Sequence, residues 1–109
     1  MAGAKGEKDR KQVEAKITDD ERLFQAEAWF DIGYQYNLNR EYGKAIETYT
    51  NSILLDPNHA ATYYHRGIEY VYFGKGDSEK AISDFQKACD MGYEKGCAAL
   101  TIALGSKRK

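Results

Sequence analysis

The sequence predicts an all-α protein made of antiparallel helix–turn–helix repeats, with about five helices in 109 residues. Three observations support this prediction: a pattern of aromatic residues and glycine recurs along the chain, apolar residues fall at helical spacing, and capping or breaking residues separate the apolar runs. With 42% hydrophobic and 30% charged residues, the chain has enough apolar material for one core. We therefore expect one folded domain.

The repeat is visible in the spacing of large rings and glycines. Trp29, Gly33 and Tyr36 each return 34 residues later as an aromatic residue or a glycine. From Lys44 onward the offset becomes 36 residues, which places an insertion in the glycine-rich stretch 73–78. The chain therefore contains two copies of one unit, and the second copy has the longer internal turn.

The first helix is predicted to begin at a capping box. Thr18 is placed as the N-cap, and Glu21 stands three residues later, so that each side chain can accept a hydrogen bond from a free backbone N–H. Apolar residues then recur at helical spacing as far as Tyr36. The polar stretch 37–40 interrupts this pattern and is expected to end the helix.

Breaking residues delimit the other helices. Pro57 is expected to stop the second helix, because proline disfavours helical geometry in the residue before it. Asn58 is predicted to cap the third helix, and Gly92 is predicted to end the fourth in a left-handed conformation. Gly105 follows the predicted end of the fifth. These helices are predicted at about 41–55, 59–73, 77–92 and 94–104.

Both ends of the chain are predicted to be tails. Residues 1–17 show no periodic pattern and are expected to be disordered, whereas residues 107–109 form a basic tail. The folded domain is therefore expected at 18–106. The basic ends lack interleaved aromatic residues and flank an acidic body, so we expect no nucleic-acid partner.

Several other functions are disfavoured by what the sequence lacks. No apolar run approaches the length of about 18 residues that a membrane-spanning helix needs, so membrane insertion is not expected. No phosphate-binding glycine loop, nucleophile elbow or zinc-protease motif is present. The carboxylates lie among lysines, where solvated ion pairs are the default. We therefore expect no enzyme, no cofactor and no metal.

The repeated residues resemble the tetratricopeptide repeat, whose pattern is W-x2-L-G-x2-Y, then A-x3-F, then P, over a period of 34 residues. Repeat one is taken as 26–59 and repeat two as 60–95, followed by a capping helix at 94–104. Repeat two departs from the pattern where Arg66 replaces leucine and Gly92 stands in place of proline. Arg66 is expected to lay its methylenes on the core and keep its charged head in water. The resemblance implies a short α–α solenoid. Its structural residues would be Trp29, Gly33, Tyr36, Ala45, Tyr49, Pro57, Tyr63, Gly67, Tyr70, Ala81 and Phe85.

The end of repeat two is similar to SEL-like repeats, which are longer relatives of the tetratricopeptide unit. In bacterial cysteine-rich members of that group, cysteines bridge neighbouring helices, which implies a disulfide between Cys89 and Cys97 here. Two buried thiols are the alternative, and a reducing cytosol would favour them. A zinc site that adds His59 and His65 is disfavoured because no paired CxxC motif is present. Localisation stays open: the absence of a visible signal peptide favours the cytoplasm, whereas a disulfide or a removed signal peptide would place the protein outside it.

Each repeat carries a second apolar stripe beyond the one needed to pack its first helix against a partner. In tetratricopeptide proteins this stripe lines the concave groove that holds peptides. Tyrosine suits such a surface, because it offers a large contact area with few torsions to freeze. The resemblance therefore implies a peptide-binding groove formed by Phe30, Tyr34, Asn37, Leu38, Tyr64, His65, Ile68, Val71 and Tyr72.

The predicted function is a non-catalytic protein–protein interaction module that binds an apolar or aromatic-containing peptide in this groove. The charged clamp for a C-terminal carboxylate known in the family is not expected, because Phe30 and Tyr34 stand at the matching places. The alternative is a self-associating structural module that buries the aromatic stripe between protomers. Two repeats are fewer than the roughly three that such arrays usually need, so a homo-oligomer or a place in a longer array stays open.

Overall fold

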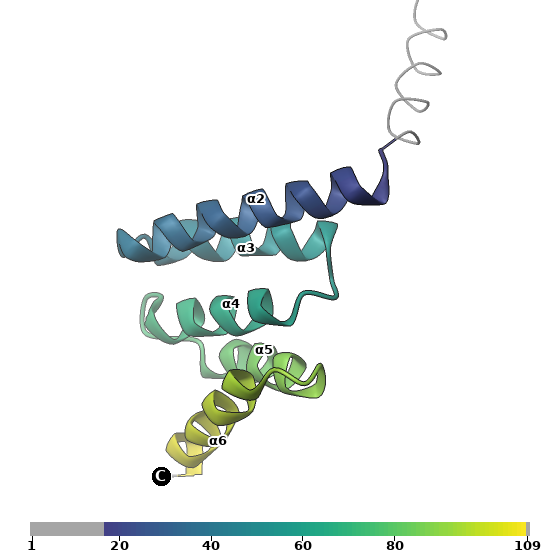
Figure 1. The fold of residues 1–109 in the computed structure, drawn as a ribbon. Helices are drawn as coiled ribbons and strands as arrows, with labels where there is room; N and C mark the ends of the chain where they lie inside the picture. Colours follow the sequence, from purple (N-terminus) through teal and green to yellow (C-terminus); the bar gives the residue numbers. More distant parts are fainter. Residues whose placement is uncertain (1–16, 109) are drawn as a thin grey trace, which may run out of the picture.

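The computed structural model describes residues 17–108, and these residues form five helices. Consecutive helices run antiparallel, so that α2 and α3 form one layer, α4 and α5 form the next, and α6 crosses the end of the stack (Figure 1). The all-α prediction is confirmed. The tail predicted at 1–17 lies outside the described residues except for Ile17. The helices are α2 (Asp19–Leu38), α3 (Tyr42–Leu55), α4 (Ala60–Tyr72), α5 (Ser78–Asp90) and α6 (Glu94–Arg108).

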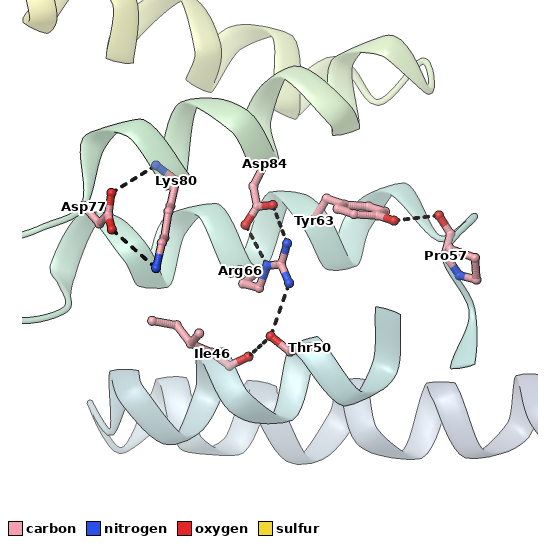
Figure 2. Close-up of polar contacts among 8 residues, drawn as sticks. All are labelled: Ile46, Thr50, Pro57, Tyr63, Arg66, Asp77, Lys80 and Asp84. Atoms are coloured by element: carbon pink, nitrogen blue, oxygen red, sulfur yellow. Dashed lines mark hydrogen bonds and ion pairs between the residues drawn. The ribbon is translucent and has the colours of Figure 1, made fainter. Parts of the chain in front are cut away.

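Side-chain caps start two of these helices. The backbone N–H of Glu21 donates to the Thr18 hydroxyl at 3.1 Å, which confirms the predicted N-cap of α2. Asp77 begins α5 in the same way, because its carboxylate accepts a hydrogen bond from the Lys80 backbone N–H at 3.1 Å (Figure 2). The Lys80 ammonium lies 3.8 Å from the second carboxylate oxygen of Asp77. Both helices therefore begin where the sequence places a short polar side chain.

The prediction that Asn58 caps the third helix is wrong. The N-cap of α4 is His59, and the backbone N–H of Asn58 instead donates to the Asp56 carboxylate at 3.1 Å. This contact closes an Asx-turn, in which an aspartate side chain accepts a hydrogen bond from the backbone N–H two residues later. The turn delays the start of the helix by one residue.

Of the two helix ends predicted at glycines, the one at Gly92 is confirmed and the one before Gly105 is wrong. Gly92 adopts φ +88° after α5, and the N–H groups of Gly92 and Tyr93 donate to the carbonyls of Cys89 and Ala88 at 2.9 and 3.0 Å. This is the glycine-ended cap that the sequence predicts. In contrast, α6 does not end at Leu104 but continues to Arg108. A glycine inside a helix costs only about 1 kcal/mol, so Gly105 does not stop it.

Glycine lets the two helices of each repeat approach closely. A Cβ atom at Gly33 would lie 2.7 Å from the ring of Tyr49, and a Cβ atom at Gly67 would lie 2.6 Å from the ring of Phe85. Tyr49 and Phe85 are almost fully buried, with 0% and 2% of their surfaces exposed. Each repeat therefore has the same contact, in which a large ring of the second helix fills the space above a glycine of the first.

Trp29 is not part of the core, contrary to the prediction. It exposes 37% of its surface, whereas Tyr63, at the same place in repeat two, exposes 8%. Tyr63 is covered by the turn before α4, where its hydroxyl donates to the Pro57 carbonyl at 2.9 Å (Figure 2). Within the described residues no helix precedes α2, so nothing covers Trp29 in this way. The burial of this position depends on the preceding repeat.

Arg66 joins three helices at the boundary between the repeats. Its guanidinium donates two hydrogen bonds to the Asp84 carboxylate on α5, at 2.8 and 2.7 Å, and a third to the Thr50 hydroxyl on α3, at 3.2 Å (Figure 2). The side chains of Arg66 and Asp84 are only 19% and 5% exposed. The expectation that the head of Arg66 stays in water is therefore wrong. The buried Asp84 carboxylate forms a bidentate ion pair with the Arg66 guanidinium.

Two buried polar groups at this boundary lack hydrogen-bond partners in the described part of the chain. Glu69 of α4 and Tyr49 of α3 are 1% and 0% exposed, and neither Oε2 of Glu69 nor the Tyr49 hydroxyl has a hydrogen-bond partner among residues 17–108. Burial raises the pKa of Glu69 to about 7. Burial and the nearby Glu69 also raise the pKa of Tyr49. Glu69 is therefore protonated in the folded protein below about pH 7.

We expect Asp84→Asn to destabilise the fold by about 2–4 kcal/mol, because it leaves the half-buried guanidinium of Arg66 without its counter-charge. Urea unfolding followed by circular dichroism measures this loss. Lys44→Met is the control, since it removes an exposed ion pair with Glu41 that is worth less than about 1 kcal/mol. An Asp84→Asn loss no larger than that of the control would show that the buried pair does not stabilise the fold.

We expect Glu69→Gln to change how stability depends on pH. The folded pKa of Glu69 is about 7 and its usual value is 4.5, so the stability that its proton contributes is complete below about pH 4.5 and is lost as the pH rises to about 7. The loss should amount to about 2–4 kcal/mol, and Glu69→Gln should abolish it.

The measurement is urea unfolding of both proteins at several pH values. The comparison of the two proteins isolates Glu69, because the lowered pKa of His65 makes its own contribution fall in the opposite direction, as the pH decreases below 6.5. Glu47→Gln, at an exposed position of α3, is the matched control. Parallel pH profiles for Glu69→Gln and the unmodified protein would contradict the prediction.

Candidate functional site

A hollow of about 580 Å³ lies between α4 and α6, with part of α5 as its floor. We call it the α4–α6 groove. Large apolar side chains of α4 form one wall, and small alanines of α6 form most of the other, which leaves room for a ligand side chain. The groove is lined by Tyr64, Ile68, Val71, Lys75, Gly76, Asp77, Ser78, Ala81, Phe85, Lys95, Ala98, Ala99, Ile102, Ala103 and Ser106.

The groove exists because the first turn of α6 packs closely on α5, whereas the C-terminal end of α6 diverges from α4. Near the start of α6, a Cβ atom at Gly96 would lie 2.7 Å from the Cβ atom of Ala88, so this glycine permits close packing on α5. A disulfide joins Cys89 at the end of α5 to Cys97 in the first turn of α6, with Cα atoms 4.5 Å apart. Figure 1 shows the yellow C-terminal end of α6 pointing away from α4.

His65 lies at the centre of a cluster of rings beside this groove. Its ring centroid is 5.2 Å from those of Phe30 and Tyr64 and 6.3 Å from that of Tyr34. All three contacts are nearly perpendicular, which is a favoured arrangement for aromatic rings. Burial lowers the pKa of His65, and the nearby charge of Lys95 lowers it further. His65 is therefore a neutral packing residue near pH 7.

A second hollow, of about 320 Å³, lies beside α2. We call it the α2 hollow. Phe30 lines it, and because Phe30 and Tyr64 both contact His65, the α2 hollow and the α4–α6 groove are neighbours. Three carboxylates give it an acidic character. It is lined by Leu23, Ala26, Glu27, Phe30, Asp31, Ser52, Asp56 and His59.

The structure brings most of the predicted groove residues together on this surface, but not as one continuous ladder. Tyr64, Ile68 and Val71 line the α4–α6 groove. Phe30 lines the α2 hollow. Tyr34 and His65 lie in the ring cluster between the hollows.

The other three predicted groove residues line neither hollow. Leu38 and Tyr72 are 58% and 59% exposed. The ring of Tyr72 stacks on Tyr42 of α3, with centroids 5.5 Å apart and planes 24° apart. Asn37 lies in the last turn of α2, where its carbonyl accepts a hydrogen bond from the Arg40 N–H at 2.9 Å. These residues lie near the helix ends, beyond the region where the neighbouring helix forms a wall.

Sequence reasoning missed the groove residues of α6. It treated this helix as a cap, although an apolar residue such as Ile102 that is 70% exposed is unusual for a cap. It also missed Lys75 and Lys95, which lie at the groove and come from different segments of the chain. The alanines and Ile102 of α6 were the available signal, but their meaning depends on the angle between α6 and α4.

The described part of the chain offers no alternative chemistry at this surface. Within residues 17–108, no group of three or more histidine, cysteine or acidic side chains is arranged to hold a metal ion. No helix in this range is both long enough and apolar enough to cross a membrane. The apolar side chains and the lysines that line the groove can contact a ligand through apolar surface and charge.

Comparison with known proteins agrees with the architecture. The tetratricopeptide repeat family model matches the chain at residues 26–59 and 60–91, which together are more than half of its length. The first match contains most of α2 and all of α3, and the second contains α4 and α5, ending before the predicted boundary at 95. No curated protein matches the chain. The two consecutive matches show that the chain belongs to the tetratricopeptide repeat family.

Proposed function

We propose that this protein binds an apolar or aromatic-containing peptide segment on its concave face, with the α4–α6 groove as the main site. Tetratricopeptide repeats are protein–protein interaction modules and non-catalytic scaffolds. The observation that carries the proposal is the pair of facing, exposed apolar walls in the groove. Val71 and Ile102 expose 48% and 70% of their surfaces there. Apolar surface gathered in a hollow commonly marks an interaction site.

The dimensions of the groove support a short peptide segment. Tyr64 and Val71 line it from positions seven residues apart on α4, a distance of about 10 Å at 1.5 Å per helical residue. An extended peptide covers that distance with about three residues. Small side chains such as Ala98 and Ala99 on the facing wall leave space for the side chains of those residues.

The same surface gives no support for catalysis. His65 lies beside the groove wall, and the rings of Phe30, Tyr34, Tyr49 and Tyr64 surround it. Its pKa is lowered by burial, so it is neutral and packed rather than positioned to transfer a proton to a ligand in the groove. We therefore infer a binding role without a reaction.

A second candidate function, self-association, is favoured by the uncovered outer edge of α2. Phe24 and Ile32 expose 73% and 43% of their surfaces on this helix. In repeat two, Arg66 is the counterpart of Ile32, and there it reaches α3 of the preceding repeat. A second protomer could cover the equivalent edge of α2. This candidate uses a different surface from the groove, so the two can be tested separately.

We expect Val71→Glu combined with Ile102→Glu to abolish peptide binding, because two carboxylates would replace the exposed apolar walls. Random dodecapeptides displayed on phage are first selected on the unmodified protein, and individual peptides are then measured by fluorescence polarisation. Affinity should fall at least about tenfold, which corresponds to about 1.4 kcal/mol. Leu54→Glu is the matched control, since Leu54 is 76% exposed on α3 and lines neither hollow. Equal binding by both variants would refute the groove.

If the α2 edge mediates self-association, light scattering at high protein concentration should give the mass of a dimer or larger species. Phe24→Glu combined with Ile32→Glu should then return the mass to that of the monomer, 12.4 kDa, because charges would replace the apolar contact. A monomeric mass for the unmodified protein at high concentration would eliminate this candidate.

A further inference from the structure

The two hollows of the concave face carry opposite charges. Lys75 and Lys95 line the α4–α6 groove, whereas Glu27 and Asp31 line the α2 hollow. All four residues are exposed, and none of them forms an ion pair with another residue among 17–106. Their charges are therefore available to a ligand.

Each hollow also contains an aspartate whose carboxylate is already engaged. In the groove, Asp77 accepts the Lys80 backbone N–H at 3.1 Å and lies 3.8 Å from the Lys80 ammonium. In the α2 hollow, Asp56 accepts the Asn58 backbone N–H at 3.1 Å. The engaged Asp77 does not cancel the two lysines of the groove. The groove therefore stays positive, and the α2 hollow stays negative.

The hollows are close enough for one short peptide to reach both. The ring of Phe30 in the α2 hollow and the ring of Tyr64 in the groove each lie 5.2 Å from His65. The Phe30 and Tyr64 centroids are therefore no more than roughly 10 Å apart. About three extended residues, at 3.3 Å each, cover that distance.

We propose that the concave face recognises a peptide in one orientation, through apolar side chains with an adjacent carboxylate in the α4–α6 groove and a lysine or arginine in the α2 hollow, about three residues beyond the peptide residue that lies at Tyr64. This inference rests on the proposed peptide-binding function. In the reverse orientation the ligand's cation would face Lys75 and Lys95, and its carboxylate would face Glu27 and Asp31. Such like-charge contacts disfavour the wrong partner or the wrong direction.

The charge pattern favours a peptide over a polyanion. A nucleic acid or an anionic lipid surface that approached Lys75 and Lys95 would bring further phosphates towards Glu27 and Asp31 across the ring cluster. Phosphates do not supply the apolar side chains that the walls of the groove require. A peptide can place an apolar group, an anion and a cation in this order.

The test uses the sequences of the dodecapeptides selected on the unmodified protein, aligned on their apolar residues. Lysine or arginine should be enriched about three residues to one side of the apolar residues, and aspartate or glutamate should be enriched beside them. Reversing the charge of the lysine or arginine in a selected peptide should weaken binding by about fivefold, which is the scale of one exposed ion pair. High salt should reduce this difference.

A second selection uses Glu27→Lys combined with Asp31→Lys. Both positions are exposed, so the fold should be retained, as circular dichroism can check. The apolar residues should still be selected, but the preference at the distant position should change from basic to acidic. Glu47→Lys, at an exposed position of α3 outside both hollows, should leave the preference unchanged.

The outcomes separate this inference from the proposed function. Selected peptides that depend on Val71 and Ile102 but show no charge preference would overturn the orientation while leaving the groove intact. A basic preference that the Glu27→Lys and Asp31→Lys substitutions do not change would also overturn it. If no peptide binds the unmodified protein better than the Val71→Glu and Ile102→Glu variant, both the orientation and the proposed function fail.

Discussion

The contact of Arg66 with Asp84 of its own repeat and with Thr50 of the preceding repeat is the polar interaction that links the two repeats. It links α3, α4 and α5 through one side chain that is largely removed from water. Such a pair gains little net free energy over an apolar contact, but its geometry is strict, because each hydrogen bond requires a defined direction. A leucine in this place would bury apolar area without fixing that direction. The residue that departs from the repeat pattern is therefore the one that makes this polar link between the repeats.

The arrangement of the two hollows follows from this link and from the path of α6. Once α4 is fixed against α3, His65 lies among the rings of α2 and α4, and the α2 hollow lies next to the α4–α6 groove. The close contact of Gly96 with Ala88 and the disulfide between Cys89 and Cys97 hold only the first turn of α6. The rest of that helix is free to diverge, and this divergence creates the surface on which we place the peptide.

The helices and the repeats were predictable from the sequence because their signals are local. The hydroxyl of Thr18 and the left-handed glycine at position 92 act on backbone groups only a few residues away, and the structure has them as predicted. Much of the candidate site was also predicted, since Tyr64, Ile68 and Val71 share one face of one helix. Asn37, Leu38 and Tyr72 were predicted from the same kind of periodic stripe, but they line neither hollow.

The sequence by itself determined which residues form helices and that two units repeat. Only the tertiary structure decided what surrounds each residue. Trp29 and Tyr63 occupy the same place in the pattern, yet one is exposed and the other buried, because burial depends on the preceding repeat. Likewise, the lysines of the groove and the carboxylates of the α2 hollow come from separate segments. Periodicity describes one helix at a time, whereas a binding surface depends on how several helices are placed together.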